Sequence, residues 1–249
     1  MLRLLVILFL SLLLSIPALA AGRYPLPPLP PPEEYGTKSL DRVSTRSGQQ
    51  PVIFPHWVHR LQISCDVCHD ELGFVMAAGE TGITEASIRA GEYCGACHNG
   101  EIAFGPKEDC RLCHGGYPGR SREMYLAVFN TKPYPSALYG NNIDWVAALE
   151  RGLISPIRSL REGYRPMTLD RTFNLDASMG RIPPAVFPHN THLEWTNCNM
   201  CHPDIFSIEK NATKHFSMNA ILEGRFCGVC HLGVAFPMDD CKRCHPGMN

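Results

Sequence analysis

One long apolar run stands at the start of the chain. Residues 1–20 carry a single basic side chain, Arg3, then a run of Leu, Ile, Val and Phe interrupted by serines, and they end in Ala-Leu-Ala20. An apolar stretch between a positive charge and small residues is typical of a secretory signal peptide. We therefore predict a signal peptide over residues 1–20, with an uncleaved membrane anchor as the alternative. The remaining pattern predicts no further membrane-spanning segment.

Beyond residue 20 the hydrophobic pattern predicts little regular structure. Residues 21–39 are rich in proline, which favours extended polyproline II, so we predict a tether there. Few later segments keep a helical or a strand period for long, and Gly-rich turns interrupt them. The predicted fold class is therefore mostly irregular, with short α-helices and little sheet.

One amphipathic helix is predicted within residues 141–152. Its apolar face includes Ile143 and Val146, which recur at helical spacing. Asn142 is the expected N-cap, and Gly152 is the expected C-terminal stop.

All twelve cysteines belong to six copies of one pattern, Cys-x-x-Cys-His. The cysteines are Cys65, Cys68, Cys94, Cys97, Cys110, Cys113, Cys198, Cys201, Cys227, Cys230, Cys241 and Cys244. The histidines that follow them are His69, His98, His114, His202, His231 and His245. Two cysteines three apart can each form a thioether with a haem vinyl group, and the next imidazole then binds the iron. Zinc sites, dithiols and disulfides do not require a histidine after every second cysteine. The pattern predicts six covalently bound haem c groups.

The six motifs lie in an internal duplication. Phe-Pro-His-x-x-His at residues 54–59 returns at residues 187–192, and the same offset relates the first two haem motifs of each half. We extend the match backwards by pairing residues 40–42 with residues 169–171. The predicted parts are a three-haem unit over residues 40–115 (unit 1), a connecting segment over residues 116–168, and a second three-haem unit over residues 169–249 (unit 2). Each unit is too small for an ordinary apolar core, so the haems are expected to supply it.

The connecting segment has no counterpart in the duplication. We expect it to pack across both units and fix their spacing. In the alternative interpretation its arginines, Arg158, Arg161 and Arg165, bind haem propionates or a partner protein.

Five histidines remain as candidates for the second axial position of the irons: His56, His59, His189, His192 and His215. The first four form two pairs, His56 with His59 and His189 with His192, and the members of each pair stand at i and i+3. They therefore project from nearly the same face of a helical turn. Each pair can therefore serve two neighbouring haems.

The order Phe-x-His-x-x-His followed by three Cys-x-x-Cys-His motifs resembles the triheme cytochrome c7 domain, which is related to cytochrome c3. The resemblance covers both units and is close around residues 94–104. It implies two haem-cored units of this type. It also implies four axial pairs, which are His56 with His69, His59 with His98, His189 with His202, and His192 with His231.

The third haem of each unit departs from the simplest form of the family. Multidomain relatives place a methionine before the second motif, and Met218 stands there, nine residues before Cys227. The resemblance therefore implies that Met218 pairs with His245, with His215 as the competitor. Thioether ligation would raise the potential of that haem.

In unit 1 the position of Met218 is occupied by Glu85, so His114 has no obvious partner. Met76 is one candidate, and Glu85 itself or Met124 of the connecting segment are others. The iron at His114 is otherwise five-coordinate.

The charge balance limits the classes of partner that we expect. The net charge is −1, and loss of Arg3 with the signal peptide would leave −2, to which haem propionates add negative charge. Nucleic acid is therefore not an expected partner. The resemblance implies an electron carrier of the cell envelope. The expected partners are other multihaem cytochromes, a quinol-oxidising membrane complex and an outer-membrane electron conduit.

The predicted location is the periplasm, with the cell surface or exterior as the alternative. An enzyme, such as an oxyanion reductase or a peroxidase, needs an iron with an open position, and only the haem at His114 is a candidate. A filament built from stacked copies is a third possibility.

Overall fold

The computed structural model describes residues 26, 28–115, 119–129, 131–209 and 211–248. The signal peptide predicted over residues 1–20 lies outside the described residues, as does the start of the predicted tether. In the described part of the chain, no helix has the length and apolar character needed to cross a bilayer.

Unit 1 begins with two short antiparallel strands. Strand β1 (Thr37–Leu40) pairs with β2 (Val52–Pro55), and α2 (Arg42–Arg46) lies in their connection. Helix α3 (His56–Arg60) follows β2 without a break, because the proline at position 55 cannot continue the strand ladder and serves as its N-cap. The remaining elements are η1 (Val67–Glu71), α4 (Glu85–Arg89), η2 (Tyr93–Ala96) and η3 (Cys110–Leu112).

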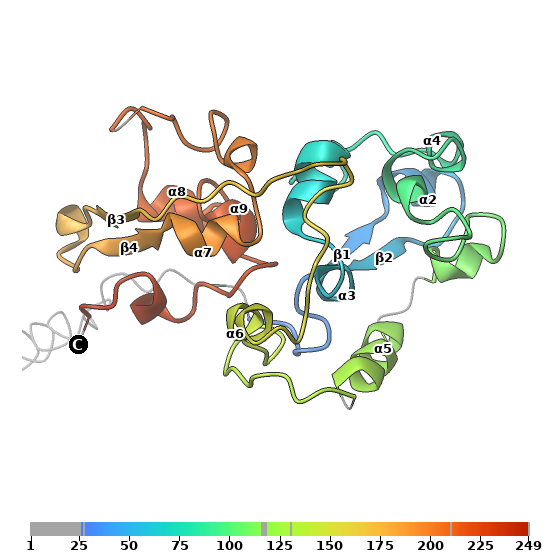
Figure 1. Cartoon of the computed structure of the whole chain (residues 1–249), viewed down its shortest axis with the longest axis horizontal. Helices are drawn as coiled ribbons and strands as arrows, with labels where there is room; N and C mark the ends of the chain where they lie inside the picture. The colour runs from blue at the N-terminus through green and yellow to red at the C-terminus, as the bar shows by residue number, and fades with distance from the viewer. Residues whose placement is uncertain (1–25, 27, 116–118, 130, 210, 249) are drawn as a thin grey trace, which may run out of the picture.

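Unit 2 repeats this order. Strand β3 (Thr172–Leu175) pairs with β4 (Ala185–Pro188), which leads directly into α7 (His189–Leu193). The other elements are η4 (Ser178–Gly180), η5 (Cys198–Met200), α8 (Met218–Leu222), α9 (Gly228–His231) and η6 (Cys241–Arg243). Figure 1 shows unit 2 on the left and unit 1 on the right, with α5 and α6 below them.

The strand register corrects one part of the predicted duplication. Leu40 stands opposite Val52, and Leu175 stands opposite Ala185. Leu175 is therefore the counterpart of Leu40, and the predicted match with Leu169 is wrong. The reason is that strand pairing fixes the correspondence, whereas a short Leu-Asp pair occurs at both positions. The unit boundaries at residues 40 and 169 remain predictions.

The connecting segment has a small aromatic core of its own. It forms α5 (Gly119–Phe129) and α6 (Trp145–Glu150). Tyr125 and Phe129 of α5 lie one helical turn apart and pack on Trp57 of α3, with ring centroids 5.6 and 5.5 Å from it. Trp57 is fully buried. The sequence pattern did not predict α5.

Helix α6 is shorter than the predicted helix. It is capped by Asp144, whose carboxylate accepts from the Ala147 N–H at 3.0 Å, so the predicted Asn142 N-cap is wrong. Asn142 instead adopts a positive φ of 58° in the preceding turn. The predicted stop at Gly152 is confirmed, since its φ of 65° is left-handed and its N–H bonds the last turn.

Residues 154–164 lie against both units, as predicted for the connecting segment. The Ile157 N–H donates to the Gln62 carbonyl at 2.7 Å, and the Ser64 N–H donates back to the Ile157 carbonyl at 3.0 Å. The guanidinium of Arg158 donates to the carbonyl of Leu193 in unit 2. In Figure 1 this stretch runs from α6 past unit 1 towards β3.

The end of the predicted tether is packed. Tyr35 is 2 % exposed, and its hydroxyl donates to the Ala235 carbonyl in unit 2. The Asn141 amide donates to the Tyr35 carbonyl at 2.8 Å, and residues 37–39 already belong to β1. The prediction of an extended tether through residue 39 is therefore wrong at its C-terminal end, because Tyr35 buries its ring. The predicted fold class, mostly irregular with short helices and little sheet, is confirmed.

Candidate functional site

Each Cys-x-x-Cys-His motif forms one helical turn. In five of the six copies the histidine N–H donates to the carbonyl of the first cysteine at 2.8 to 2.9 Å. In the first copy the turn is the π-type element η1 around Cys68 and His69. The turn brings both sulfurs and the imidazole of one motif to the same side of the backbone.

A glycine is required inside the second motif of each unit. A Cβ atom at Gly95 would lie 1.9 Å from the Ile88 carbonyl oxygen, and a Cβ at Gly228 would lie 1.9 Å from the Ile221 carbonyl oxygen. The motif turn therefore packs backbone to backbone on α4 in unit 1 and on α8 in unit 2.

Three of the four implied histidine pairs lie opposite one another at similar separations. The ring centroids are 6.4 Å apart for His56 and His69, 6.2 Å for His59 and His98, and 6.2 Å for His192 and His231. Two imidazoles bound to opposite sides of one metal ion have centroids about 6.3 Å apart, since each metal–nitrogen bond is about 2.0 Å. The separations match two axial ligands with one iron between them. No ring contact joins His189 to His202, although both are described residues.

The Nδ1 atoms of ten histidines are held by the backbone. Each lies 2.7 to 3.2 Å from a carbonyl oxygen, and the ten residues are His56, His59, His69, His98, His114, His189, His192, His202, His231 and His245. A carbonyl oxygen only accepts hydrogen bonds, so Nδ1 carries the proton in each ring. Nε2 is then the free nitrogen, which is the arrangement that orients a histidine toward a metal. His215 has no such bond within the described part of the chain.

Burial keeps several of these imidazoles neutral. Desolvation lowers the pKa of His56 and of His231 to about 4, and it lowers the pKa of His59, His69 and His192. A neutral ring is the form that binds iron. Phe54 and Phe187 support the sites from behind, with ring centroids 4.3 Å from His59 and His192.

The thiols do not resemble those of redox-active dithiol sites. Desolvation raises the pKa of Cys68 and Cys230 to about 12 and that of Cys94 and Cys227 to about 11. Redox-active cysteines have lowered pKa values instead. Among the described residues no disulfide and no cluster of metal-ligating side chains occurs. With the paired Nε2 atoms, this donor set fits covalently attached haem.

The six attachment sites form one series of neighbours. Within unit 1, the charge of Cys97 raises the pKa of Cys68, and that of Cys113 raises the pKa of Cys94. Within unit 2, Cys230 lies close to Cys201, and Cys227 lies close to Cys244. Cys65 of unit 1 and Cys230 of unit 2 join the two halves, because the charge of Cys65 also raises the pKa of Cys230. No motif stands apart from the rest.

At the third site of unit 1, no second ligand contacts His114 among the described residues. His114 is fixed by the Gln50 carbonyl at 2.8 Å. Glu85 stands at the start of α4, exposed and ion-paired with Arg89 at 2.6 Å. Met76 is half-buried in the loop before α4, and Met124 lies in α5. No hydrogen bond or ring contact links His114 to any of these three residues in the described chain.

The third site of unit 2 has the same backbone contact and the same kind of helix cap. His245 is fixed by the Pro183 carbonyl at 2.7 Å, and Pro183 is the counterpart of Gln50. Met218 begins α8 as Glu85 begins α4, and Ser217 caps α8 as Thr84 caps α4. Both Met218 and His215 are exposed, and within the described residues neither makes a hydrogen bond or ring contact with His245.

Sequence reasoning missed the parts of the site that are made by the backbone. The carbonyl acceptors of the Nδ1 protons, such as those of Gly36 and Pro183, leave no signal in residue type. The phenylalanine two residues before each His-x-x-His pair was visible in the pattern, yet its stacking on the second histidine was not predicted.

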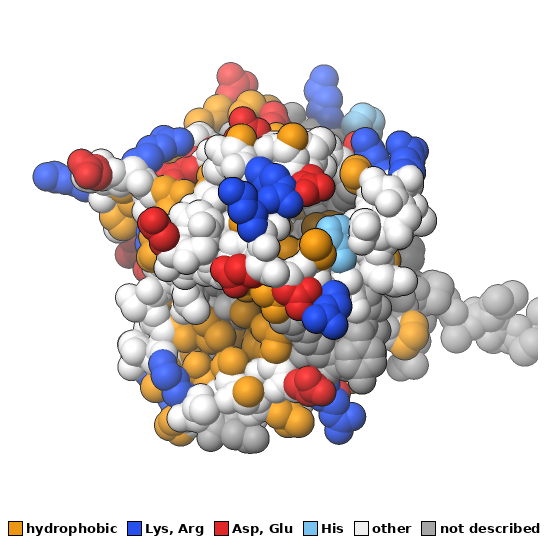
Figure 2. Space-filling view, turned by 90° about the vertical axis from the view of Figure 1, so that its right-hand side faces the viewer, with side chains coloured by type: hydrophobic (Ala, Val, Ile, Leu, Met, Phe, Trp, Pro, Cys, Tyr) orange, Lys and Arg blue, Asp and Glu red, His pale blue; other side chains and the backbone are white. Residues whose placement is uncertain are grey.

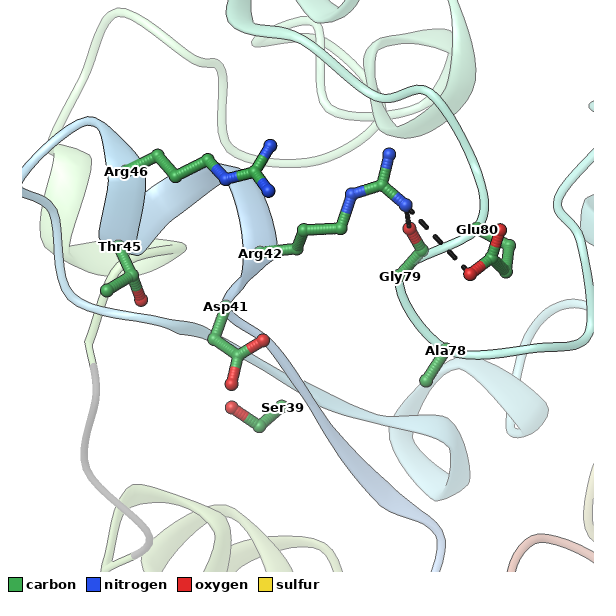
Figure 3. A pocket seen from close by; sticks show the side chains of 8 residues that line it. All are labelled: Ser39, Asp41, Arg42, Thr45, Arg46, Ala78, Gly79 and Glu80. Atoms are coloured by element: carbon green, nitrogen blue, oxygen red, sulfur yellow. Dashed lines mark hydrogen bonds and ion pairs between the residues drawn. The ribbon is translucent and has the colours of Figure 1, made fainter.

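The structure also has a cavity that the motifs do not explain. It measures about 570 Å³ and lies between α2 and residues 78–80 of unit 1 (Figure 3). Arg42 crosses its edge to bind the Gly79 carbonyl at 2.8 Å, and Arg46 and Asp41 also line it. Figure 2, which looks onto the side of unit 1 with α4 and α5, shows hydrophobic side chains in a hollow bordered by charges of both signs.

Comparisons with known proteins point to one family for both units. The family model described as cytochrome c7 and related cytochrome c matches residues 52–115 and 185–246. A search of curated proteins finds no match.

The similar solved structures include two of this kind. The C-terminal hexaheme fragment of GSU1996 is 26 % identical, over 88 % of this chain and 99 % of that chain, with a TM-score of 0.29. A c7-type three-heme cytochrome domain is 35 % identical, over 32 % of this chain and 91 % of that chain, with a TM-score of 0.29.

Proposed function

The chain belongs to the family of cytochrome c7 and related cytochromes c, as its sequence pattern predicted, and we propose that it is a hexahaem electron carrier of the cell envelope. Cytochromes of this type are multihaem electron-transfer proteins. Six haem groups and a place in the envelope go beyond family membership, and they rest on the residues of this chain.

The observation that carries the proposal is the unbroken series of attachment sites. Each Cys-x-x-Cys-His motif lies next to another, and Cys65 and Cys230 continue the series between the units. Bound haem c supplies a one-electron couple at each site. An electron carrier needs cofactors that are close together along its whole length, and the neighbouring motifs support such an arrangement.

The proposed haem ligands are those implied by the sequence. Twelve cysteines form the thioethers, and the six motif histidines bind the irons from one side. The proposed second ligands are His56, His59, His189, His192 and Met218, with His215 and Met76 as weaker candidates. Backbone carbonyls hold the Nδ1 atoms of the imidazole rings and leave Nε2 free to bind iron. The rings are therefore ordered before haem binds, which reduces the cost of ordering the site.

The proposed setting is the periplasm, with the cell surface or exterior as the alternative. The apolar run at residues 1–20 supports export, and c-type haem is attached outside the cytoplasm. We propose other multihaem cytochromes, a quinol-oxidising membrane complex and an outer-membrane electron conduit as redox partners. Electron-transfer contacts of this kind are small and transient.

The test is a count of haems and electrons on the exported protein. We expect intact mass spectrometry to show six haem additions and a reductive titration to consume six electrons per chain. The controls are Cys198→Ala with Cys201→Ala and, separately, Cys110→Ala with Cys113→Ala, each of which should remove one haem. Fewer than six haems in the unaltered protein would contradict the hexahaem proposal.

A reductase that uses the haem at His114 is the second candidate. The ion pair between Glu85 and Arg89 favours it. Glu85 is the counterpart of the proposed ligand Met218, and the ion pair engages it in an interaction other than iron binding. Electron paramagnetic resonance of the oxidised protein separates the two functions. A high-spin signal from one iron in six that shifts with cyanide would support an open site, and six low-spin irons that ignore cyanide would exclude it.

A further inference from the structure

One side chain at the boundary between the units has no part in haem attachment. Arg60 ends α3 directly after His59, and its counterpart at the end of α7 is Leu193. The guanidinium of Arg60 leaves unit 1 and donates from Nη2 to the Val234 carbonyl of unit 2, at 2.9 Å. Unit 1 therefore places a cation across the boundary, whereas unit 2 has the uncharged Leu193 at the matching position.

The surroundings of this cation are aromatic and uncharged. Its guanidinium carbon lies 5.3 Å from the ring centroid of Trp145 and 5.9 Å from that of Trp195. The ionisable groups that act on it are Cys65, Tyr35 and Cys230, and no carboxylate pairs with it among the described residues. Arg60 is half-buried. An arginine held by aromatic faces and a carbonyl keeps its full charge, because guanidinium does not deprotonate at physiological pH.

Two haem attachment sites meet at this cation. Cys65 belongs to the first motif of unit 1, and its backbone N–H donates to the Trp195 carbonyl of unit 2 at 3.1 Å. Cys230 belongs to the second motif of unit 2, four residues before the Val234 carbonyl that Arg60 binds. The guanidinium therefore lies where the attachment site of one unit approaches that of the other.

We propose that Arg60 is a redox-tuning residue shared by these two sites, which raises the reduction potential of the haems attached at Cys65 and Cys230. The proposal rests on the proposed function as a haem-bearing carrier. Oxidation adds one positive charge to an iron, and a fixed cation nearby opposes that charge, most strongly where burial lowers the local dielectric. The two haems at the boundary are therefore more easily reduced than they would be with a neutral residue at position 60.

The test compares three variants of the full, haem-loaded protein. Arg60→Gln removes the charge and keeps an amide N–H for the Val234 carbonyl, and Arg60→Lys keeps the charge. Arg122→Gln removes a cation that is 69 % exposed on α5, and serves as the control for net charge. Haem content is measured first, and the potential of each haem is then followed in a redox titration by nuclear magnetic resonance of its shifted methyl signals.

We expect Arg60→Gln to lower two of the potentials by at least a tenfold change in the reduction equilibrium constant, about 59 mV for one electron. Arg60→Lys and Arg122→Gln should leave all potentials close to those of the unaltered protein. If Arg60→Gln fails to load haem, Arg60→Leu replaces it with the same expectation, because unit 2 folds with leucine at this position.

Two results would overturn the proposal. One is a neutral variant with full haem content and unchanged potentials. The other is an equal shift in Arg60→Lys, because that would trace the effect to packing rather than charge. A failure of the proposed function is separate, since it would appear as missing haem in the unaltered protein.

Discussion

The helices α3 and α7 carry the same two histidines at the same spacing, but their other side chains differ. In α3 the residue after the first histidine is Trp57, which is fully buried against α5. In α7 the same position is Asn190, which is exposed. The duplicated pattern thus fixes the haem-facing side of each helix, while the other side determines what the unit packs against.

This difference lets α3 of unit 1 contact both the connecting segment and unit 2. Helix α3 holds the connecting segment through Trp57 and unit 2 through Arg60. Residues of the first motif of unit 1 are also enclosed, since Asp66 is 1 % exposed and Val67 is fully buried. At the matching positions of unit 2, Asn199 is exposed and Met200 is 8 % exposed. Both units therefore bury a side chain of their first haem motif, and unit 1 adds the aromatic contact between α3 and α5.

The largest expected effect comes from removing the side chain that anchors the connecting segment. Trp57→Ala should destabilise the haem-loaded protein by about 3–5 kcal/mol, because it leaves a cavity against Tyr125 and Phe129. At roughly 2–4 °C per kcal/mol, this is a fall of about 10 °C in Tm. Asn190→Ala, the matched control in unit 2, should change stability by less than about 0.5 kcal/mol.

Thermal unfolding followed by circular dichroism measures both variants. Equal losses from Trp57→Ala and Asn190→Ala would contradict the unequal roles of the two helices. Haem content should equal that of the unaltered protein in both variants, since neither side chain faces an iron in this scheme.

The second expected effect should be the same in both units. Gly95→Ala and Gly228→Ala each place a Cβ 1.9 Å from a backbone carbonyl oxygen, so α4 or α8 must move away from its motif turn. Each substitution should cost about 1–3 kcal/mol. Gly82→Ala is a control with open space around the Cβ. Chemical unfolding checks the three variants, and a neutral result at one of the two motif glycines would show that the units are not equivalent there.

Much of the candidate site could be predicted from the sequence because it is local. The motif turns, the two His-x-x-His helices and the stop at Gly152 depend on residues close together in the chain. Helix α5 could not be predicted this way, because Tyr125 and Phe129 pack on Trp57, which lies far away in the sequence.

The errors have the same physical origin. Asn142 and Asp144 are both good N-caps, and the choice between them depends on the left-handed turn that Asn142 makes. Tyr35 looks like part of a proline-rich tether until unit 2 supplies the carbonyl that its hydroxyl binds. The contact of Arg60 with unit 2 was not visible in the sequence, because only the folded chain brings the Val234 carbonyl to it.

The smallest expected effect on stability concerns Glu85 of unit 1 and its counterpart Met218 of unit 2, which is a proposed ligand. Glu85 and Met218 both stand first in their helices, after a hydroxyl N-cap. Glu85→Met should give the haem at His114 a thioether ligand and raise its potential, since methionine ligation favours ferrous iron. Met218→Glu should remove that ligand from the haem at His245 and lower its potential. Both side chains are exposed, so apart from the iron–sulfur bond that is gained or lost, stability should move by less than about 0.5 kcal/mol.

The readout for this exchange is the charge-transfer absorption of methionine-ligated ferric haem, together with the potentials. We expect the band to be present in the unaltered protein, to be lost in Met218→Glu and to grow in Glu85→Met. Glu85→Gln is the control for loss of the Arg89 ion pair without a sulfur, and it should add no band. His215→Ala decides the remaining alternative at unit 2, because the band should survive it if Met218 is the ligand. A band that persists in Met218→Glu would contradict this assignment, and the equivalence of α4 and α8 as ligand helices would then fail.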